Sequence, residues 1–333
     1  MADLVRLIGD DEPGEAGPEA VAPSPPNPRS VLGADDRAAL AALAVGELRF
    51  DEPLRRHTTL KLGGPADAWV APSTIAGLAA LLRACAARRL PVTVLGGGSN
   101  LLVRDGGVRG VVVSSRQLRG LSLTSPTTIT VQAGVSTGKL LSLATRSALG
   151  GLEFLGGVPG SVGGGLIMNA GTYLGEFTQV TTAVRSLRLA DGELVARDHA
   201  ACGFRYRGSD LPPTEIVVEA DLALAPRPQP EIEADVKALR QRRAEREPLR
   251  VSSHGSTFKN PPGDFAGRLI ETAGCKGWRE GDAVCSEVHA NWLVNVGAAT
   301  AADLERLIAR VHARVREVHG VELELEVKRL GEP

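Results

Sequence analysis

The 333-residue sequence contains few aromatic side chains and few cysteines. Only 3% of the residues are Phe, Trp or Tyr, so Leu, Val and Ala must supply most of the hydrophobic core. The four cysteines form no CxxC pair and stand near no histidine at zinc-finger spacing, which argues against both a disulfide scaffold and a structural zinc site. We therefore expect no bound metal.

The sequence also lacks long apolar runs and a strong net charge. No stretch of eighteen apolar residues occurs, and the first residues, MADLVRLIGDDEPGEAG, do not resemble a signal peptide, so we expect a cytoplasmic protein with no membrane contact. The formal net charge of −1 gives no indication of a nucleic-acid partner. Because residues 1–36 are acidic, the remainder carries +5, which suits an anionic ligand.

Composition and hydrophobic period divide the chain into a tail and a folded body. Residues 9–33 contain six prolines among small and acidic residues, so we expect residues 1–34 to be a disordered tail. Strand patterns outnumber helix patterns between residues 57 and 224, which favours an α+β fold over a doubly wound parallel sheet. The proline-rich stretch 225–233 marks a domain boundary. The resulting division is 35–226 and 227–320, with a C-terminal strand at 321–331 returning to the first domain.

Three C-terminal elements are expected from local signals. A helix over residues 264–273 has Asp264 as its expected N-cap, and a longer helix begins after Thr300, with Asp303 completing a capping box, and ends at Gly320. Residues 321–328 then alternate strictly between apolar and charged side chains, which is typical of a strand.

Two glycine-rich segments stand out as candidate ligand-binding loops. The first, GGGSN at residues 96–100, follows a strand but has Leu101 where a dinucleotide-binding Rossmann fingerprint needs glycine. The second, residues 156–171, contains seven glycines in sixteen positions. GVSTGKLL imitates a P-loop but has Leu140 where Ser or Thr would bind magnesium, so it is excluded. Two glycine turns in one domain indicate an extended ligand with a pyrophosphate.

Eight motifs taken together resemble one enzyme family. TTLKLGGPADAWV, VLGGGSNLLV, GGVPGSVGGGLIMNAG, GFRYRGSDL, GSTFKNP, AGRLIETAGCKG, HANWLVN and ELEVKRLG occur in order between about residues 50 and 331. In this order they resemble the UDP-N-acetylenolpyruvoylglucosamine reductases. Arg207 and Ser256 are separated by only 49 positions, which resembles the shorter type of the family, without an extra substrate loop.

The resemblance implies both a fold and a reaction. The fold would be the FAD-binding fold of the vanillyl-alcohol-oxidase (PCMH) type, with two subdomains and a C-terminal α/β substrate-binding domain. NADPH would reduce non-covalently held FAD, and flavin N5 would then pass hydride to UDP-N-acetylenolpyruvoylglucosamine, giving UDP-N-acetylmuramate for peptidoglycan. The partners would be these small molecules alone, and the enzyme would be a monomer.

The same resemblance assigns roles to individual residues. Ser256 would donate the proton, Arg207 would lie beside the substrate carboxylate, and Glu326 would help to polarise the enolic form. Lys259, Asn260 and His289 are candidate substrate contacts. The implied FAD contacts are Gly63, Gly64, Gly96, Gly97, Gly98, Ser99, Asn100, Leu101, Pro159, Gly160, Ser161, Gly163, Gly164, Asn169 and Gly171. Two positions depart from the family pattern, since His57 and His254 replace the more usual asparagine and alanine.

Two alternatives remain open on the sequence. One is an oxidase or dehydrogenase of the same flavin fold that passes electrons to oxygen, although such enzymes often attach FAD through a histidine that the first glycine segment lacks. The other is an inactive nucleotide-binding regulatory module. Oxygen consumption distinguishes the first alternative, and bleaching of a yellow protein by NADPH distinguishes the second.

Overall fold

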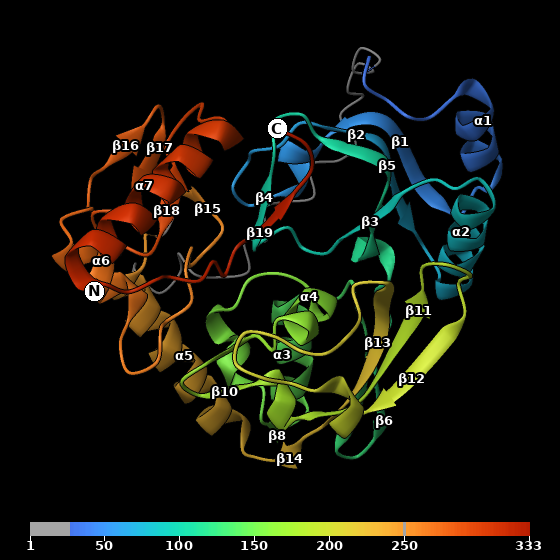
Figure 1. Ribbon diagram of the computed structural model, residues 1–333. Coiled ribbons are helices and arrows are strands. Elements are labelled where there is room, and N and C mark those ends of the chain that lie inside the picture. Colours follow the sequence, from blue (N-terminus) through green and yellow to red (C-terminus); the bar gives the residue numbers. More distant parts are fainter. Residues whose placement is uncertain (1–26, 249–250) are drawn as a thin grey trace.

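The computed structural model describes residues 27–248 and 251–333, and Figure 1 shows that they form three packing units. We call these the N-terminal unit (27–118), the central unit (119–248) and the C-terminal unit (251–327). Each contains its own sheet with helices against it, so the expected α+β organisation is present.

The N-terminal unit holds a four-stranded sheet in the order β1-β2-β5-β3. Strands β1 and β2 are antiparallel, whereas β5 is parallel to both of its neighbours. The elements are α1 (Ala34–Ala42), β1 (Gly46–Pro53), β2 (Pro65–Pro72), α2 (Ile75–Ala87), β3 (Val92–Leu95), β4 (Leu101–Val103) and β5 (Val108–Ser114). The apolar faces of α2, β2 and β5 form one buried cluster, and Trp69, Leu54 and Val112 belong to a second.

The central unit is built on a five-stranded antiparallel sheet in the order β12-β11-β13-β7-β6. The larger elements are β6 (Leu121–Ser125), β7 (Thr128–Gln132), α3 (Thr137–Arg146), α4 (Val162–Ile167), β11 (Thr181–Arg188), β12 (Leu194–Asp198), β13 (Glu215–Ala223) and α5 (Gln229–Arg246). Short pairs are made by β8 (Leu149–Gly150) with β14 (Ala225–Pro226) and by β9 (Gly171–Thr172) with β10 (Gly175–Glu176).

The C-terminal unit packs two helices against a small antiparallel sheet in the order β15-β18-β17-β16. Its elements are β15 (Ser252–Ser253), α6 (Ala266–Thr272), β16 (Arg279–Glu280), β17 (Ala283–Cys285), β18 (Leu293–Asn295) and α7 (Ala301–His319). The chain then leaves this unit, and β19 (Lys328–Leu330) pairs in parallel with β4. The C-terminus therefore ties the first and last units together, as Figure 1 shows.

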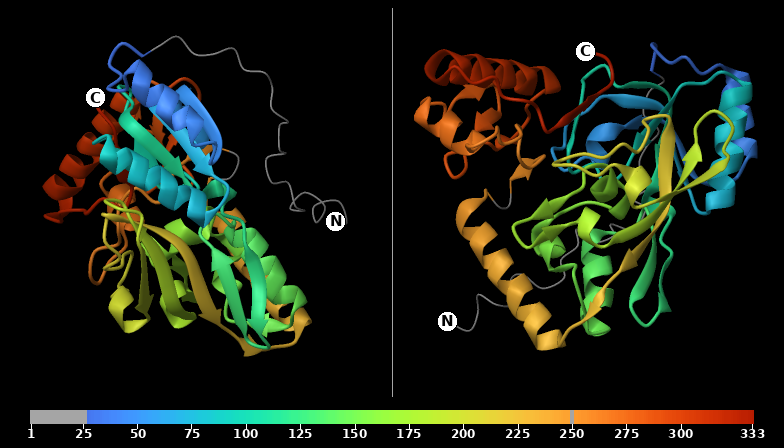
Figure 2. Two further views of the ribbon diagram at one scale, coloured as in Figure 1. Left: turned by 90° about the vertical axis from the view of Figure 1, so that its right-hand side faces the viewer. Right: turned by 60° about the horizontal axis from the view of Figure 1, so that its bottom comes forward.

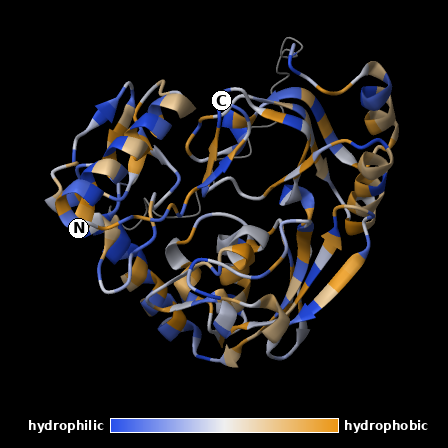
Figure 3. Ribbon diagram, in the orientation of Figure 1, coloured by the Kyte–Doolittle hydropathy of each residue, from blue (hydrophilic) through white to orange (hydrophobic). Residues whose placement is uncertain are grey.

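Helix α7 shows how the local sequence sets an element. Thr300 accepts a hydrogen bond from the Asp303 amide, the Asp303 side chain accepts one from the Thr300 amide, and Gly320 ends the helix at φ +66°. Hydrophobic and hydrophilic residues both occur along it (Figure 3), and its buried positions include Leu304, Leu307 and Val311. The expected limits of this helix are confirmed.

Three local features differ from the sequence interpretation. Phe265, not Asp264, is the N-cap of α6, while Asp264 pairs with Arg268. The alternation predicted a strand from residue 321. Leu323 and Val327 are buried as that pattern requires, but the hydrogen-bonded strand begins only at Lys328. In the right-hand view of Figure 2, α5 lies along the central unit, and its residues Ile232 and Val236 join that unit's core rather than that of the C-terminal unit.

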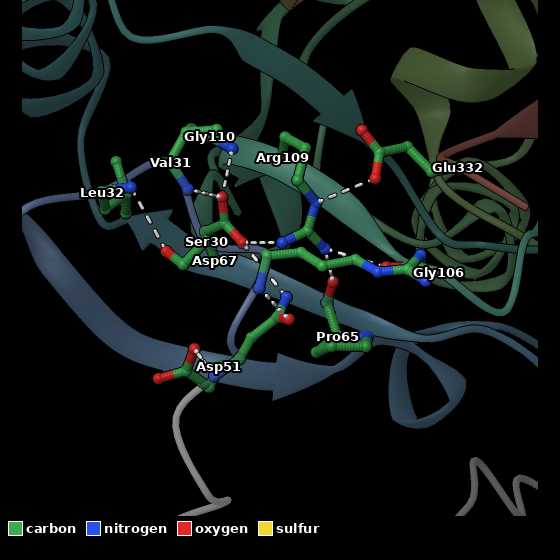
Figure 4. A network of polar contacts seen from close by, with 12 residues as sticks. Ser30, Val31, Leu32, Asp51, Pro65, Asp67, Gly106, Arg109, Gly110 and Glu332 are labelled. Carbon is green, nitrogen blue, oxygen red and sulfur yellow. Dashed lines mark hydrogen bonds and ion pairs between the residues drawn. The ribbon is translucent and has the colours of Figure 1, made fainter.

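Residues 27–33, placed in the tail by composition, lie against the rest of the N-terminal unit (Figure 4). The Val31 amide donates to the Asp67 carboxylate (3.1 Å), the Asn27 amide donates to Asp51 (3.0 Å), and Leu32 is buried. We call residues 27–33 the N-terminal strap. The folded region therefore begins before residue 35, because the fully buried Asp67 carboxylate accepts hydrogen bonds from this segment. The rest of the expected tail, residues 1–26, lies outside the described residues.

Candidate functional site

One cavity of about 710 Å³ is bordered by all three units. Its lining includes most of both glycine segments, one face of α5, and residues on either side of the start of the C-terminal unit. Of the predicted site residues, the following line it: Gly96, Gly97, Gly98, Ser99, Asn100, Leu101, Pro159, Gly160, Ser161, Gly163, Gly164, Gly171, Arg207, Ser256 and Glu326. The fold thus collects residues that are far apart in the sequence.

The two glycine segments lie directly against each other. A Cβ atom on Gly97 would come within 2.8 Å of the Gly160 Cα, and one on Gly160 within 2.7 Å of the Ser99 hydroxyl. The Ser99 hydroxyl donates to the Pro159 carbonyl across the same contact (3.3 Å). Glycine is therefore needed here for backbone-to-backbone contact, and the cavity wall that results has almost no side chains.

Arg207 lies at the tip of a tight turn closed by hydrogen bonds between Arg205 and Gly208. Its φ of +54° is in the left-handed region, which an arginine rarely adopts. The turn is attached to the second glycine segment, because buried Asn169 donates to the Arg205 carbonyl (3.1 Å) and Ser209 donates to the Ile167 carbonyl (3.0 Å). These contacts hold an unusual backbone conformation that turns Arg207 into the cavity lining.

Ser256 follows Gly255, whose φ is +78°. The next two residues are held firmly: the Thr257 amide donates to the Asn291 carbonyl (2.8 Å), and the Phe258 amide donates to the Asn291 side chain (3.0 Å). Because Thr257 and Phe258 are both buried, Ser256 sits on a rigid support at the edge of the cavity.

Glu326 lies between the Ser256 loop and the first glycine segment. Its amide donates to the Thr257 carbonyl (2.9 Å), and its carbonyl accepts from the Asn100 side chain (3.1 Å). The Glu326 Oε1 is 3.2 Å from the Arg207 Nε. Burial raises the pKa of Glu326, although the positive charges of Arg207, Lys259 and Lys328 act in the opposite direction. The site therefore pairs a cation with a carboxyl group that binds a proton more readily than usual.

Sequence reasoning did not single out the arginines of α5. Arg242, Arg243 and Arg246 line the cavity, and Arg242 stacks on the ring of Tyr173, another lining residue (4.7 Å). Arg243 pairs with Glu247 (2.6 Å), whereas no carboxylate among the described residues forms an ion pair with Arg242 or Arg246. Their spacing of three and four residues places them on one face of the helix, and this was the available sequence signal. A charged helix face is usually exposed to solvent, so the spacing did not indicate a binding site.

Six of the predicted site residues lie outside the cavity lining. Gly63 and Gly64 allow close packing on Val103 and Asp105, and Asn169 supports the Arg207 turn as described above. Lys259 pairs with Glu324 (2.5 Å), and Asn260 accepts a hydrogen bond from the Ala266 amide at the start of α6 (3.0 Å). His289 accepts one from the Asn291 amide (3.2 Å), and burial lowers its pKa.

The lining suits an anionic dinucleotide. Two backbone walls of glycine permit close approach of a ligand. The buried hydroxyl of Ser161 has no hydrogen-bond partner among the described residues, and two guanidinium groups of the lining form no ion pair with a carboxylate among those residues.

The described residues contain no group of three His, Cys, Asp or Glu side chains arranged to hold a metal ion. None of the helices in the described ranges is long and apolar enough to cross a membrane. All four cysteines are buried free thiols.

Comparison with known families covers both halves of this site. The family described as "FAD binding domain" matches residues 66–197, and that described as "UDP-N-acetylenolpyruvoylglucosamine reductase, C-terminal domain" matches residues 247–330. The chain is 46% identical to the UDP-N-acetylenolpyruvoylglucosamine reductase of Rubrobacter xylanophilus, over 86% of this chain and 96% of the relative. It is 43% identical to the same-named protein of an Anaeromyxobacter species, over 90% and 93% of the two chains.

A solved structure agrees with these sequence matches. The crystal structure of UDP-N-acetylenolpyruvylglucosamine reductase from Thermus caldophilus aligns with a TM-score of 0.74 at 38% identity, over 86% of this chain and 98% of that one. The expected FAD-binding fold with a separate C-terminal domain is thereby confirmed. This chain belongs to the UDP-N-acetylenolpyruvoylglucosamine reductase family, the flavin-dependent oxidoreductases of peptidoglycan precursor synthesis.

Proposed function

We propose that this reductase uses NADPH to convert UDP-N-acetylenolpyruvoylglucosamine into UDP-N-acetylmuramate through non-covalently bound FAD, as a cytoplasmic monomer. The observation that carries the proposal is the meeting of Arg207, Ser256 and Glu326 at one cavity bordered by both glycine segments. When bound, FAD would supply the chemistry of hydride transfer, first from NADPH and then to the enolpyruvyl double bond. The glycine segments, with Ser99, Asn100 and Ser161, would hold it.

Ser256 is proposed to donate the proton that completes reduction. Addition of hydride to the terminal methylene leaves negative charge on the neighbouring carbon and its carboxylate. A serine hydroxyl is a weak acid, so it needs a strongly basic acceptor and a fixed position. Thr257 and Phe258, both buried and hydrogen-bonded to Asn291, supply that fixed position.

Arg207 and Glu326 are proposed to stabilise the developing negative charge. The planar guanidinium suits a carboxylate, because it can donate two parallel hydrogen bonds. The Glu326 Oε1 lies 3.2 Å from the Arg207 Nε, and burial raises the pKa of Glu326. The carboxyl group can therefore be protonated at the stage when the substrate carboxylate takes its enolic form. The strained turn that carries Arg207 would keep the cation at this position through the reaction.

The arginines of α5 are proposed to bind phosphate groups. Arg242 and Arg246 bring two positive charges to the cavity, and NADPH and the UDP-sugar both carry a diphosphate. The ring of Tyr173, which is largely exposed and stacks on Arg242, adds a flat surface at the same place.

A two-step absorbance experiment tests the function. The purified protein should be yellow, lose its visible flavin absorbance when NADPH is added anaerobically, and regain it when the enolpyruvyl nucleotide follows. Acid precipitation should release all of the colour into the supernatant. Recovery of colour with oxygen but not with the nucleotide would assign the protein to the oxidase alternative, and colour retained in the pellet would refute non-covalent binding.

A further inference from the structure

One buried histidine at the cavity has no role in the reaction described above. His254 is only 2% exposed and lines the cavity two residues before Ser256. Both of its ring nitrogens are shielded from solvent, and neither has a hydrogen-bond partner among the described residues. A buried polar group without a hydrogen-bond partner lowers the stability of a fold. A ligand that hydrogen-bonds to the ring nitrogens would remove this penalty.

The surroundings of His254 connect it to the first glycine segment. Its neighbour Ser253 accepts a hydrogen bond through its carbonyl from the Thr59 hydroxyl (2.6 Å). The Thr59 amide in turn donates to the Gly98 carbonyl (3.2 Å). His254 is therefore held beside the wall assigned to the cofactor, on a segment that ends at the Ser256 loop.

The protonation state of the ring limits what it can bind. Burial lowers the pKa of His254 to about 4, so the imidazole is neutral near pH 7. A neutral imidazole offers one N–H donor and one acceptor nitrogen, which suits a ligand carrying both carbonyl and imide groups, such as a flavin ring. A carboxylate or phosphate would favour a charged partner instead.

We propose that His254 is a cofactor-binding residue, whose ring hydrogen-bonds to FAD when FAD occupies the cavity. This inference rests on the proposed function, in which the glycine segments hold FAD. Because solvent reaches neither nitrogen, pairing with FAD requires a rotation of the ring. The unpaired nitrogens then become paired, and the flavin is fixed relative to Ser256.

Titration of apo-protein with FAD tests the proposal, with flavin fluorescence as the readout. His254→Phe keeps a ring but removes both nitrogens, so it should melt at the same or a higher temperature without FAD, yet bind FAD about 3- to 10-fold more weakly. His254→Asn should recover part of the affinity, because an amide restores a donor and an acceptor. His319→Phe, on α7 and outside the cavity lining, should leave FAD affinity unchanged.

The outcomes separate this inference from its alternatives. Equal FAD affinity in His254→Phe and the wild type would show that the ring only fills space. An unchanged FAD affinity with a raised KM for the nucleotide would mean that the ring contacts substrate, and would also overturn the proposal. If the wild-type protein binds no FAD, the proposed function is refuted, and the inference about His254 is refuted with it.

A second measurement reads the effect of FAD on the wild-type protein itself, and a variant serves only to assign the signals. The chain has only six histidines, so the ring nitrogens of ¹⁵N-histidine-labelled wild-type protein can be resolved by NMR. The signals absent from His254→Asn belong to His254, and they should move when FAD is added, whereas the His319 signals should not. Unmoved His254 signals would overturn the proposal.

Discussion

Two groups of residues that line the cavity are built in different ways. The glycine side consists of two continuous segments whose backbones touch, and its shape depends on the absence of side chains at Gly97 and Gly160. A second set of lining residues consists of Arg207, Ser256 and Glu326, each carried by a different part of the chain. The glycine side is a surface for binding, and the second set provides three functional groups whose relative positions depend on tertiary contacts.

This difference teaches where each kind of change should act. A substitution on the glycine side alters a backbone contact, so stability and cofactor binding should change together. A substitution at Arg207, Ser256 or Glu326 removes a functional group from a rigid support, so one chemical step should change while the fold survives. The predictions below test this separation.

The largest effect is expected for Ser256→Ala. Its reduction by NADPH should be nearly unchanged, because that half-reaction needs no proton at the substrate. Reoxidation by the enolpyruvyl nucleotide should slow by about 10²–10⁴-fold, as is typical when a general acid is lost. Stopped-flow absorbance of the flavin measures both half-reactions. Equal slowing of both would show that Ser256 supports the flavin or the fold.

The pair Arg207 and Glu326 should give a smaller loss in the same half-reaction. Arg207→Lys keeps the charge but not the paired donors, and Glu326→Gln removes the titratable carboxyl, so each should slow reoxidation by about 10- to 10²-fold. Glu324→Gln is the matched control, because Glu324 is exposed and pairs with Lys259 outside the cavity lining. A comparable loss in this control would contradict the assignment of Glu326.

The histidine beside Ser256 predicts a pH effect on the apo-protein. The pKa of His254 is lowered to about 4 in the folded state from an ordinary 6.5, so the unfolded chain binds its proton first as the pH falls. Stability should therefore be lost between pH 6.5 and pH 4, by about 3 kcal/mol at the lower limit. His254→Phe should show a shallower loss in urea titrations across this range. Parallel curves for the two proteins would refute the shift.

Gly98→Ala tests the glycine side. Gly98 has φ +69°, and a Cβ there would lie 2.0 Å from the His57 carbonyl, so the loop must move. We expect a loss of about 1–3 kcal/mol in stability together with reduced flavin content. Gly138→Ala is the control, because Gly138 lies in α3 with no atom within 4 Å of an added Cβ, and alanine favours helix. Normal flavin content in Gly98→Ala would contradict the role of this segment.

An effect on stability alone is expected at the N-terminal strap. Composition predicts that deletion of 1–33 leaves the enzyme nearly intact, but the contacts of Asn27, Val31 and Leu32 change that expectation for 27–33. Deletion of 1–26 should be silent, whereas deletion of 1–33 should cost about 1–3 kcal/mol, because Asp67 and Asp51 each lose an amide donor. Thermal unfolding compares the two truncations. Identical melting temperatures would show that the strap contributes nothing.

Local sequence signals determined those elements whose causes lie within a few residues. The Thr300 cap, the Gly320 stop and the glycine segments were all evident, since capping, left-handed backbone and close approach depend on residue type at that position. Single residues such as Ser256 and Glu326 carried no distinguishing local signal, and only the resemblance across the whole chain singled them out.

Tertiary structure alone decided the arrangements that depend on distant partners. Asp67 is buried among groups from residues 31, 109 and 110, so the folded region begins earlier than composition indicated. The face of α5 that reaches the cavity, and the attachment of Asn169 to the Arg207 turn, likewise depend on packing between units. Hydrogen bonding and burial are satisfied by whichever groups the fold brings together, and a local pattern does not contain that information.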